Sequence, residues 1–299
     1  MSLPAVVWLL LASIWGSTWL FIKVGLEDLP PVTFAGLRFV VASGPLLLWL
    51  WLRRVPLPTA RSDWRLMIVT GWLTFSLNYG LVFWGEQYIS SGLAAILYTT
   101  FPISGLLIAH GLLPAEPLTR RKGIGVILAV LGVALIFANQ VEFRGALAAA
   151  GSAALVVAAA GTAWADVLIK RSGTHIDPVV MTAVQMVAGF IPMLLIGIPL
   201  EGNPLHYDWT GRAAFALLYL ALLGSSLTFV LLYWLIQRME VTRTMLIPLF
   251  STLIAVLLGM VVLDEELTLR VALGGAGILL GLVVATRRPR VVHPHDVPG

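Results

Sequence analysis

The chain has 299 residues, of which 59% are hydrophobic and 11% are charged. Soluble domains carry about 25% charged residues, so these few charges cannot cover a soluble core, and we expect an integral membrane protein. The net charge of +4 lies in short clusters between apolar runs, which does not indicate a nucleic-acid partner. The chain has no cysteine, which excludes disulfides, thiolate metal sites and thiol catalysis.

Ten stretches are apolar enough to be predicted as membrane-spanning helices, since a span needs roughly 20 apolar residues. In chain order they are 3–22, 32–52, 66–84, 90–113, 123–138, 146–169, 178–200, 213–236, 244–263 and 271–286. The first lacks a basic leader and a small-residue cleavage site, so we expect it to be retained as a span. The fifth and tenth are short and rich in glycine, which favours tight packing at a repeat or dimer interface.

The chain contains an internal repeat. Ile22-Lys23, Pro31, Arg38 and Pro45 are each followed 147 residues later by Ile169-Lys170, Pro178, Gln185 and Pro192. We therefore divide the chain into a first half at 1–139, a second half at 145–287 and a polar cytoplasmic tail at 288–299. Five spans per half is an odd number, so the second half enters the membrane from the opposite side. This arrangement of two inverted repeats is common in secondary transporters, whose substrate site lies where the repeats meet.

Loop charges predict the orientation. Fourteen Lys and Arg residues fall on the side that holds both termini and four on the other side, with Arg38 inside a span. Cytoplasmic loops carry the excess of basic residues, so both termini are predicted to be cytoplasmic.

No catalytic constellation is found in the sequence. It has no phosphate-binding loop of the Gly-x-x-x-x-Gly-Lys type, no His-Glu-x-x-His and no Gly-x-Ser-x-Gly. We therefore expect neither ATP hydrolysis nor a metal site, a cofactor or a catalytic residue, and the protein is not predicted to be an enzyme.

Two ionisable residues lie inside predicted spans, where charge is costly and often functional. Asp166 either forms an intrahelical pair with Lys170, four residues along, or binds a substrate amine or couples transport to protons. Arg38 has Gln185 as its counterpart, so its role is not symmetric. A structural partner such as Glu27 or a helix-end carbonyl is the simpler explanation for Arg38.

Aromatic and polar side chains recur on equivalent spans of the two halves. The first span carries Trp15 and Trp19, and the third carries Asn78, whose amide would be costly against lipid. Pro102 and Pro248 interrupt the corresponding fourth and ninth spans, and paired broken helices point to a transport site.

With Trp15-Gly16-Ser17-Thr18, Lys23, Pro31 and Leu37-Arg38-Phe39, and with the run from Ala94 through Tyr98, Pro102 and Glu116, the chain resembles the drug/metabolite transporter superfamily. The resemblance is to its EamA-type ten-helix exporters and, within these, to YddG-like exporters of aromatic and other hydrophobic amino acids. It implies a central cavity lined by the first, third, fourth, sixth, eighth and ninth spans, with the fifth and tenth packed away from it.

The sequence thus predicts an all-α, multi-pass protein of the cell inner membrane that exports small amphipathic metabolites, foremost hydrophobic or aromatic amino acids, by alternating access. Its partners are the small-molecule substrate, the lipid bilayer and, if Asp166 couples transport, a proton; the sequence does not determine the oligomeric state. The predicted substrate-binding residues are Trp15, Trp19, Asn78, Tyr79, Tyr98, Trp164, Asp166, Ser225, Phe229 and Tyr233. A transporter of nucleotide- or lipid-linked sugars, which would need basic residues around its cavity, and a membrane enzyme are the alternatives.

Overall fold

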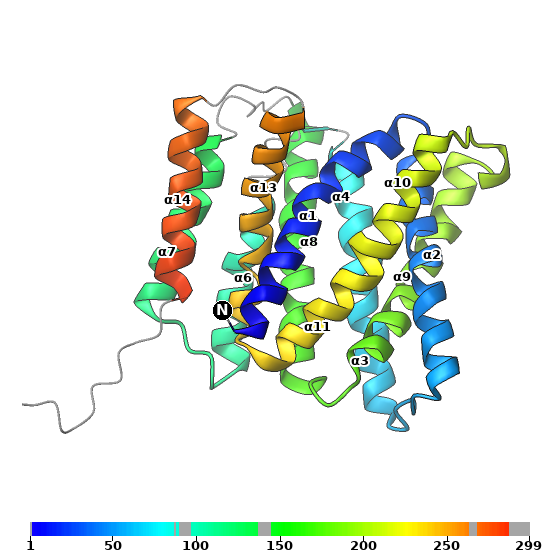
Figure 1. Ribbon diagram of the computed structural model, residues 1–299, viewed down its shortest axis with the longest axis horizontal. Coiled ribbons are helices and arrows are strands. Elements are labelled where there is room, and N and C mark those ends of the chain that lie inside the picture. Colours follow the sequence, from blue (N-terminus) through cyan, green and yellow to red (C-terminus); the bar gives the residue numbers. More distant parts are fainter. Residues whose placement is uncertain (1, 87, 90–96, 137–144, 263–267, 287–299) are drawn as a thin grey trace, which may run out of the picture.

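The computed structural model describes residues 2–86, 88–89, 97–136, 145–262 and 268–286. Throughout these ranges the regular structure is helical, with no strand, which confirms the predicted all-α class (Figure 1). Four described helical stretches are long and apolar enough to cross a membrane: Pro31–Arg53, Ala146–Ser172, Pro178–Glu201 and Gly211–Arg238.

The helices of the first half agree closely with the predicted spans. They are α1 (Leu3–Leu26), α2 (Pro31–Arg53), α3 (Arg61–Gly71), η1 (Trp72–Leu77), α4 (Asn78–Glu86), α6 (Thr100–Leu112) and α7 (Arg120–Ile136). The elements α3, η1 and α4 follow one another without a break and contain the predicted third span. Part of the predicted fourth span, at residues 90–96, lies outside the described residues.

The second half repeats this order. Its helices are α8 (Gly145–Ser172), α9 (Pro178–Glu201), η3 (Pro204–His206), α10 (Gly211–Ala221), η4 (Leu222–Leu227), α11 (Thr228–Arg238), α12 (Val241–Thr244), α13 (Ile247–Val262) and α14 (Leu269–Thr286). Proline at the first position starts α9, and the Asp177 carboxylate caps it by accepting hydrogen bonds from the backbone N–H of Val179 (2.8 Å) and Val180 (3.2 Å).

Two π-helical segments stand at matching places in the halves. The elements η1 and η4 each span six residues, and each lies between two α-helical stretches of one continuous helix. Their wider turns are not encoded in hydrophobic periodicity, so the sequence did not predict them. π-Helical turns are frequently found at functional sites, and each of these segments has a buried face, with Thr74 and Phe75 in η1 and Gly224, Ser225 and Ser226 in η4.

Helix pairs from opposite halves form the two edges of the bundle. In Figure 1, α7 packs against α14 at one edge, and α2 packs against α9 at the other. The α7–α14 contact is made by glycines: a Cβ atom at Gly125 would lie 2.6 Å from the carbonyl oxygen of Gly281, and one at Gly132 would lie 2.5 Å from that of Gly274. The glycine-rich fifth and tenth segments therefore pack at an interface between the halves, one of the two alternatives that their composition left open.

The outer faces of the helices are apolar. Trp51 is 74% exposed and Leu195 is 71% exposed, and many other leucines and isoleucines project outward in the same way. Such a surface is suited to lipid chains and not to water. The labelled N-terminus and the end of α14 lie toward the same end of the bundle (Figure 1).

A charged contact ties each half to the other at the ends of the bundle. Asp28 accepts hydrogen bonds from Thr210 Oγ1 (2.5 Å) and Arg212 Nε (3.2 Å), and together these donors hold the pKa of the Asp28 carboxyl below its ordinary value. His175 Nε2 lies 3.1 Å from Asp63 Oδ2. His175 follows Asp28 by 147 residues, so an imidazole in the second half stands where the first half has a carboxylate.

Candidate functional site

An internal cavity of ≈ 210 Å³ lies where the two halves meet. Its wall is built by α1, α2, η1, α4, α6, α8, α11, α12 and α13 and by residues 98–99. Six of the predicted site residues line it: Trp15, Asn78, Tyr79, Tyr98, Asp166 and Phe229. Pro102 and Pro248, from the two helices that proline interrupts, also lie in this wall.

Aromatic rings make one connected surface beside the cavity. The Phe229 ring packs against Trp15 (centroids 5.7 Å apart) and Phe75 (4.7 Å), and Phe39 packs against Phe75 (4.7 Å) and Tyr79 (5.1 Å). These edge-to-face and tilted pairs fix the orientation of the rings. Apolar solutes with a ring would therefore meet a preformed wall.

Polar atoms hold the aromatic residues in place. Trp15 Nε1 donates to Thr228 Oγ1 at 3.2 Å, and the Tyr98 hydroxyl donates to Asn78 Oδ1 at 2.9 Å. Because Asn78 faces Tyr98 and the cavity, its amide is not left unsatisfied against lipid. This placement agrees with the expectation that Asn78 faces the interior.

Arg38 is buried, with 5% of its surface exposed, and it forms part of the cavity wall. Its Nε donates to Ser225 Oγ at 2.7 Å and its Nη2 donates to the Gly224 carbonyl at 3.0 Å. Both partners belong to η4, so this guanidinium joins α2 to the π-helical segment of the other half. Glu27 instead pairs with Arg212 at 3.1 Å, so Glu27 is not the partner of Arg38.

Asp166 is 2% exposed, lines the cavity and has one carboxylate oxygen, Oδ1, without a hydrogen-bond partner in the described structure. The Asp166–Lys170 pair that the spacing permits does not form. Lys170 Nζ donates instead to the carbonyls of Ile236 (2.6 Å) and Met239 (2.8 Å), near the end of α11. A cation near a helix C-terminus stabilises its last carbonyls, so Lys170 joins α8 to α11.

Four predicted site residues do not form part of the described cavity wall. Trp164 is 51% exposed and lies two residues from Asp166, on the opposite face of α8. Ser225 is buried behind Arg38, and Tyr233 is buried beside Phe229, with ring centroids 6.1 Å apart. The side chain of Trp19 lies outside the described part of the structure.

Several cavity residues were missed when the sequence was read alone. Arg38 was assigned a structural role, and Thr74 and Thr244 were not considered. A buried threonine between apolar residues gives no signal by itself, because its hydroxyl can bond within its own helix. Arg38 and Gln185 occupy equivalent positions of the repeat but differ in charge, and this difference was the feature of the sequence that could have marked Arg38 as a cavity residue.

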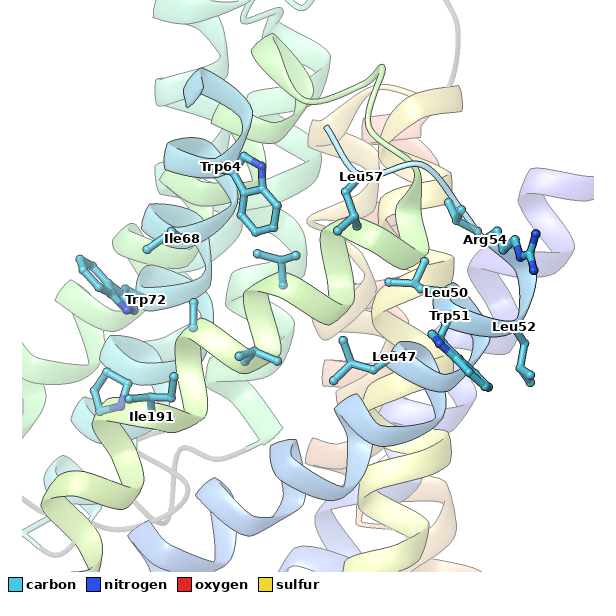
Figure 2. Close-up of a pocket in the computed structure, with 15 residues that line it drawn as sticks. Leu47, Leu50, Trp51, Leu52, Arg54, Leu57, Trp64, Ile68, Trp72 and Ile191 are labelled. Atoms are coloured by element: carbon cyan, nitrogen blue, oxygen red, sulfur yellow. The ribbon is translucent and has the colours of Figure 1, made fainter. Parts of the chain in front are cut away.

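A larger groove of ≈ 1090 Å³ opens on the outer surface between α2, α3 and α9. Figure 2 shows its wall, with Leu47, Leu50 and Trp51 from α2 and with Trp64 and Ile68 from α3. Arg54 alone carries a charge among the described residues that line it. Apart from Arg54 at its edge, the described lining of this groove offers no charged group that would orient a small metabolite, so the smaller cavity between the helices is the better candidate site.

An apolar helical bundle with a cavity between its halves, and with buried charged groups in the cavity wall, has the architecture of a membrane transporter. The sequence comparison agrees. The model of the EamA-like transporter family matches residues 3–138 and 149–287, and the chain belongs to this family. The two matches coincide with the two halves of the internal repeat.

The chain is similar to several curated transporters. It is 30% identical over 274 residues to the uncharacterized transporter YoaV of Bacillus subtilis, covering 91% of this chain and 93% of that protein. It is 28% identical over 253 residues to the uncharacterized inner membrane transporter YedA of Escherichia coli, covering 82% and 78%. A crystal structure with 17% sequence identity has the same fold, with a TM-score of 0.82 over 95% of this chain and 98% of that one. The protein is therefore a multi-pass membrane transporter.

Proposed function

We propose that the protein exports small amphipathic metabolites, foremost hydrophobic and aromatic amino acids, across the cell inner membrane by alternating access. The observation that carries this proposal is the cavity between the halves, whose wall combines the rings of Trp15, Tyr79, Tyr98 and Phe229 with the charged Arg38 and Asp166. Its volume of ≈ 210 Å³ lies below the roughly 300–1,000 Å³ of pockets for drug-sized ligands, which favours a small solute.

Uptake into liposomes tests the substrate class. Purified protein reconstituted with radiolabelled phenylalanine, threonine or leucine outside should accumulate label above empty liposomes, and preloading with the same amino acid should accelerate uptake. If none of several amino acids gives uptake above empty liposomes, the substrate class is wrong.

We also propose ten spans in two inverted halves with both termini in the cytoplasm. The support is the excess of basic residues on one side, the two family matches and the matching π-helical segments. Because the natural chain has no cysteine, single cysteines report topology directly. Asn203→Cys should react with a membrane-impermeant maleimide in intact cells and Arg290→Cys only after lysis; labelling of both in intact cells would contradict this topology.

For the driving force we propose proton exchange at Asp166. The support is its burial and the unpartnered oxygen in the cavity wall, where binding of a proton and of a substrate ammonium would exclude one another. Asp166→Asn should abolish the dependence of net transport on a pH gradient while exchange of substrate persists. An unchanged gradient dependence would leave a facilitator or another coupling group.

A transporter of nucleotide- or lipid-linked sugars has less support. Its substrate carries several negative charges, yet Arg38 is the one basic residue among the described residues of the cavity wall, and Lys170 is engaged with α11. Competition by a nucleotide sugar against amino-acid uptake would revive this alternative.

A further inference from the structure

The wall of the cavity holds one guanidinium and one carboxyl group, and among the described residues these two do not form an ion pair with each other. Arg38 from α2 and Asp166 from α8 both form part of its wall, and within the described residues neither forms an ion pair with another side chain. A buried charge without a counter-charge is costly. A structure that keeps two such groups in one small cavity is suited to a ligand that carries both charges.

Arg38 is fixed from behind. Two of the five donors of a guanidinium are used by Ser225 and Gly224, and the Tyr79 side chain also forms a hydrogen bond with Arg38, with its ring centroid 5.6 Å from the Cζ atom. The hydrogen bonds to Ser225 and Gly224 both run to η4, so the guanidinium plane is oriented before any ligand enters. A fixed guanidinium is the group best shaped to bind a carboxylate through two parallel hydrogen bonds.

Asp166 has the complementary property. Its carboxylate is almost fully buried, Lys170 is directed to α11, and Oδ1 has no partner. An ammonium group bound at this oxygen would supply both the missing hydrogen bond and the missing charge. The rings of Trp15, Tyr79, Tyr98 and Phe229 belong to the same wall and offer apolar area for a side chain.

We propose that Arg38 and Asp166 form a two-point site for zwitterions, in which Arg38 binds the α-carboxylate and Asp166 binds the α-ammonium group of one amino acid. This inference rests on the proposed function and specifies how its substrate is recognised. It assigns the carboxylate to Arg38 and gives Ser225, which the sequence placed among the binding residues, the task of positioning Arg38.

The test uses three ligands of similar shape: phenylalanine, 3-phenylpropionate, which lacks the ammonium group, and 2-phenylethylamine, which lacks the carboxylate. Each competes with labelled phenylalanine for counterflow into liposomes that hold the wild-type protein. Phenylalanine should compete roughly 10–100-fold better than either analogue, since each charge-assisted contact is worth that factor. This comparison needs no variant, so it stands even if a substitution impairs folding.

Two variants then assign the contacts. Asp166→Asn should weaken competition by phenylalanine roughly 10–100-fold and leave competition by 3-phenylpropionate unchanged. Arg38→Gln should weaken competition by phenylalanine and leave competition by 2-phenylethylamine unchanged. Trp164→Phe, on the opposite face of α8 from Asp166, is the control and should change none of the three.

The outcomes separate this inference from the proposed function. Suppose that the wild-type protein transports phenylalanine but that both analogues compete as well as phenylalanine does, or that each variant weakens the binding of all three ligands by the same factor. The two-point site is then wrong, and the proposal of an amino-acid exporter stands. If wild-type protein transports no amino acid, the proposed function is wrong and the two-point site is wrong with it.

Discussion

The π-helical segments η1 and η4 each form one equivalent hydrogen bond to a neighbouring helix, and the side chains next to that bond differ between the two segments. Ser76 donates to the carbonyl of Gly189 and Ser226 to the carbonyl of Ala42, both at 2.7 Å. Ser226 follows Ser76 by 150 residues, and Gly189 follows Ala42 by 147, so this bond is the same bond in the two halves. In each case it joins a π-helical segment to the helix of the other half that packs beside it.

Next to this common bond the chemistry diverges. In η4 the Ser225 hydroxyl accepts from Arg38, whereas the corresponding residue in η1 is Phe75, which is fully buried. Gln185, the counterpart of Arg38, donates through Nε2 to Thr70 Oγ1 at 2.5 Å, one turn earlier. The bond between a serine and a backbone carbonyl thus occurs in both segments, whereas Arg38 lines the cavity and its counterpart Gln185 is not among the described residues that line it.

We expect the largest effect from removing the hydrogen bond that only one half possesses. Ser225→Ala leaves the buried Nε of Arg38 without its acceptor, so apparent affinity for phenylalanine should fall by roughly 10-fold or more. Competition assays in liposomes measure this loss. Thr70→Val, which removes the acceptor of the neutral Gln185, is the matched variant for the other half, and an equal loss in both would show that the asymmetry has no functional meaning.

The close approach of α9 to α3 should give the next largest effect, on stability. A Cβ atom at Gly71 would lie 2.7 Å from the carbonyl oxygen of Gln185, which is backbone and cannot turn away. Gly71→Ala should cost about 1–3 kcal/mol of unfolding free energy and lower the midpoint of thermal unfolding in detergent. Its counterpart in the second half is already Ala221.

Gly123→Ala in α7 is the control for this steric effect, because a Cβ atom at Gly123 meets no atom within 4 Å. Gly123→Ala should leave the unfolding midpoint unchanged or raise it slightly, since alanine favours helix. If both glycine variants unfold at the same temperature, the backbone contact at Gly71 is not tight in the membrane.

A smaller and equal effect is expected at the shared bond. Ser76→Ala and Ser226→Ala each remove a neutral hydrogen bond to a carbonyl of the partner helix, which is worth about 1 kcal/mol. Their unfolding midpoints should therefore fall by similar amounts, and Ser226→Ala should leave substrate affinity close to that of the wild type. A much larger fall in the unfolding midpoint of one variant than of the other would show that the two hydrogen bonds are not equivalent.

The smallest effect is expected at the loop contact of Asp28 with Thr210 and Arg212. Thr210 and Arg212 lower the pKa of Asp28 from its ordinary 3.8, so this contact stabilises the folded state above about that pH and is lost as the pH falls below the folded-state pKa. Arg212→Gln should lower the unfolding midpoint by less than about 3 °C at neutral pH. The difference between the midpoints of the variant and the wild type should be smaller in acid. A difference that widens in acid would give the wrong sign.

The helical class could be predicted because apolar length is a property of the sequence alone. The 147-residue repeat is also read from the sequence, and the division into two inverted halves that it indicates stays a prediction. Six of the ten predicted site residues line one cavity, because polar or aromatic side chains within a span need an interior position; their role in substrate binding stays a prediction. Trp164 was included because symmetry with the first span suggested it, but its own helical face points outward.

The partners of Arg38 could not be predicted, for a different physical reason. Its partners, Gly224 and Ser225, lie 186 and 187 residues away, in a π-helical segment that hydrophobic periodicity does not reveal. Helical spacing likewise offered Asp166, four residues earlier, as an ion-pair partner for Lys170, but Lys170 binds backbone carbonyls at the end of α11. Helical spacing identifies which groups can meet within one helix, but it does not determine which of them tertiary packing brings to another helix.

The glycine contact between α7 and α14 limits how far apart these two helices can lie. A Cβ atom at Gly125 would lie 2.6 Å from the Gly281 carbonyl oxygen, and one at Gly281 would lie 2.4 Å from that of Gly125; Gly132 and Gly274 oppose each other in the same way. Each obstacle is backbone, so replacing the facing residue does not remove it. A side chain at any of these four positions would therefore force α7 and α14 apart.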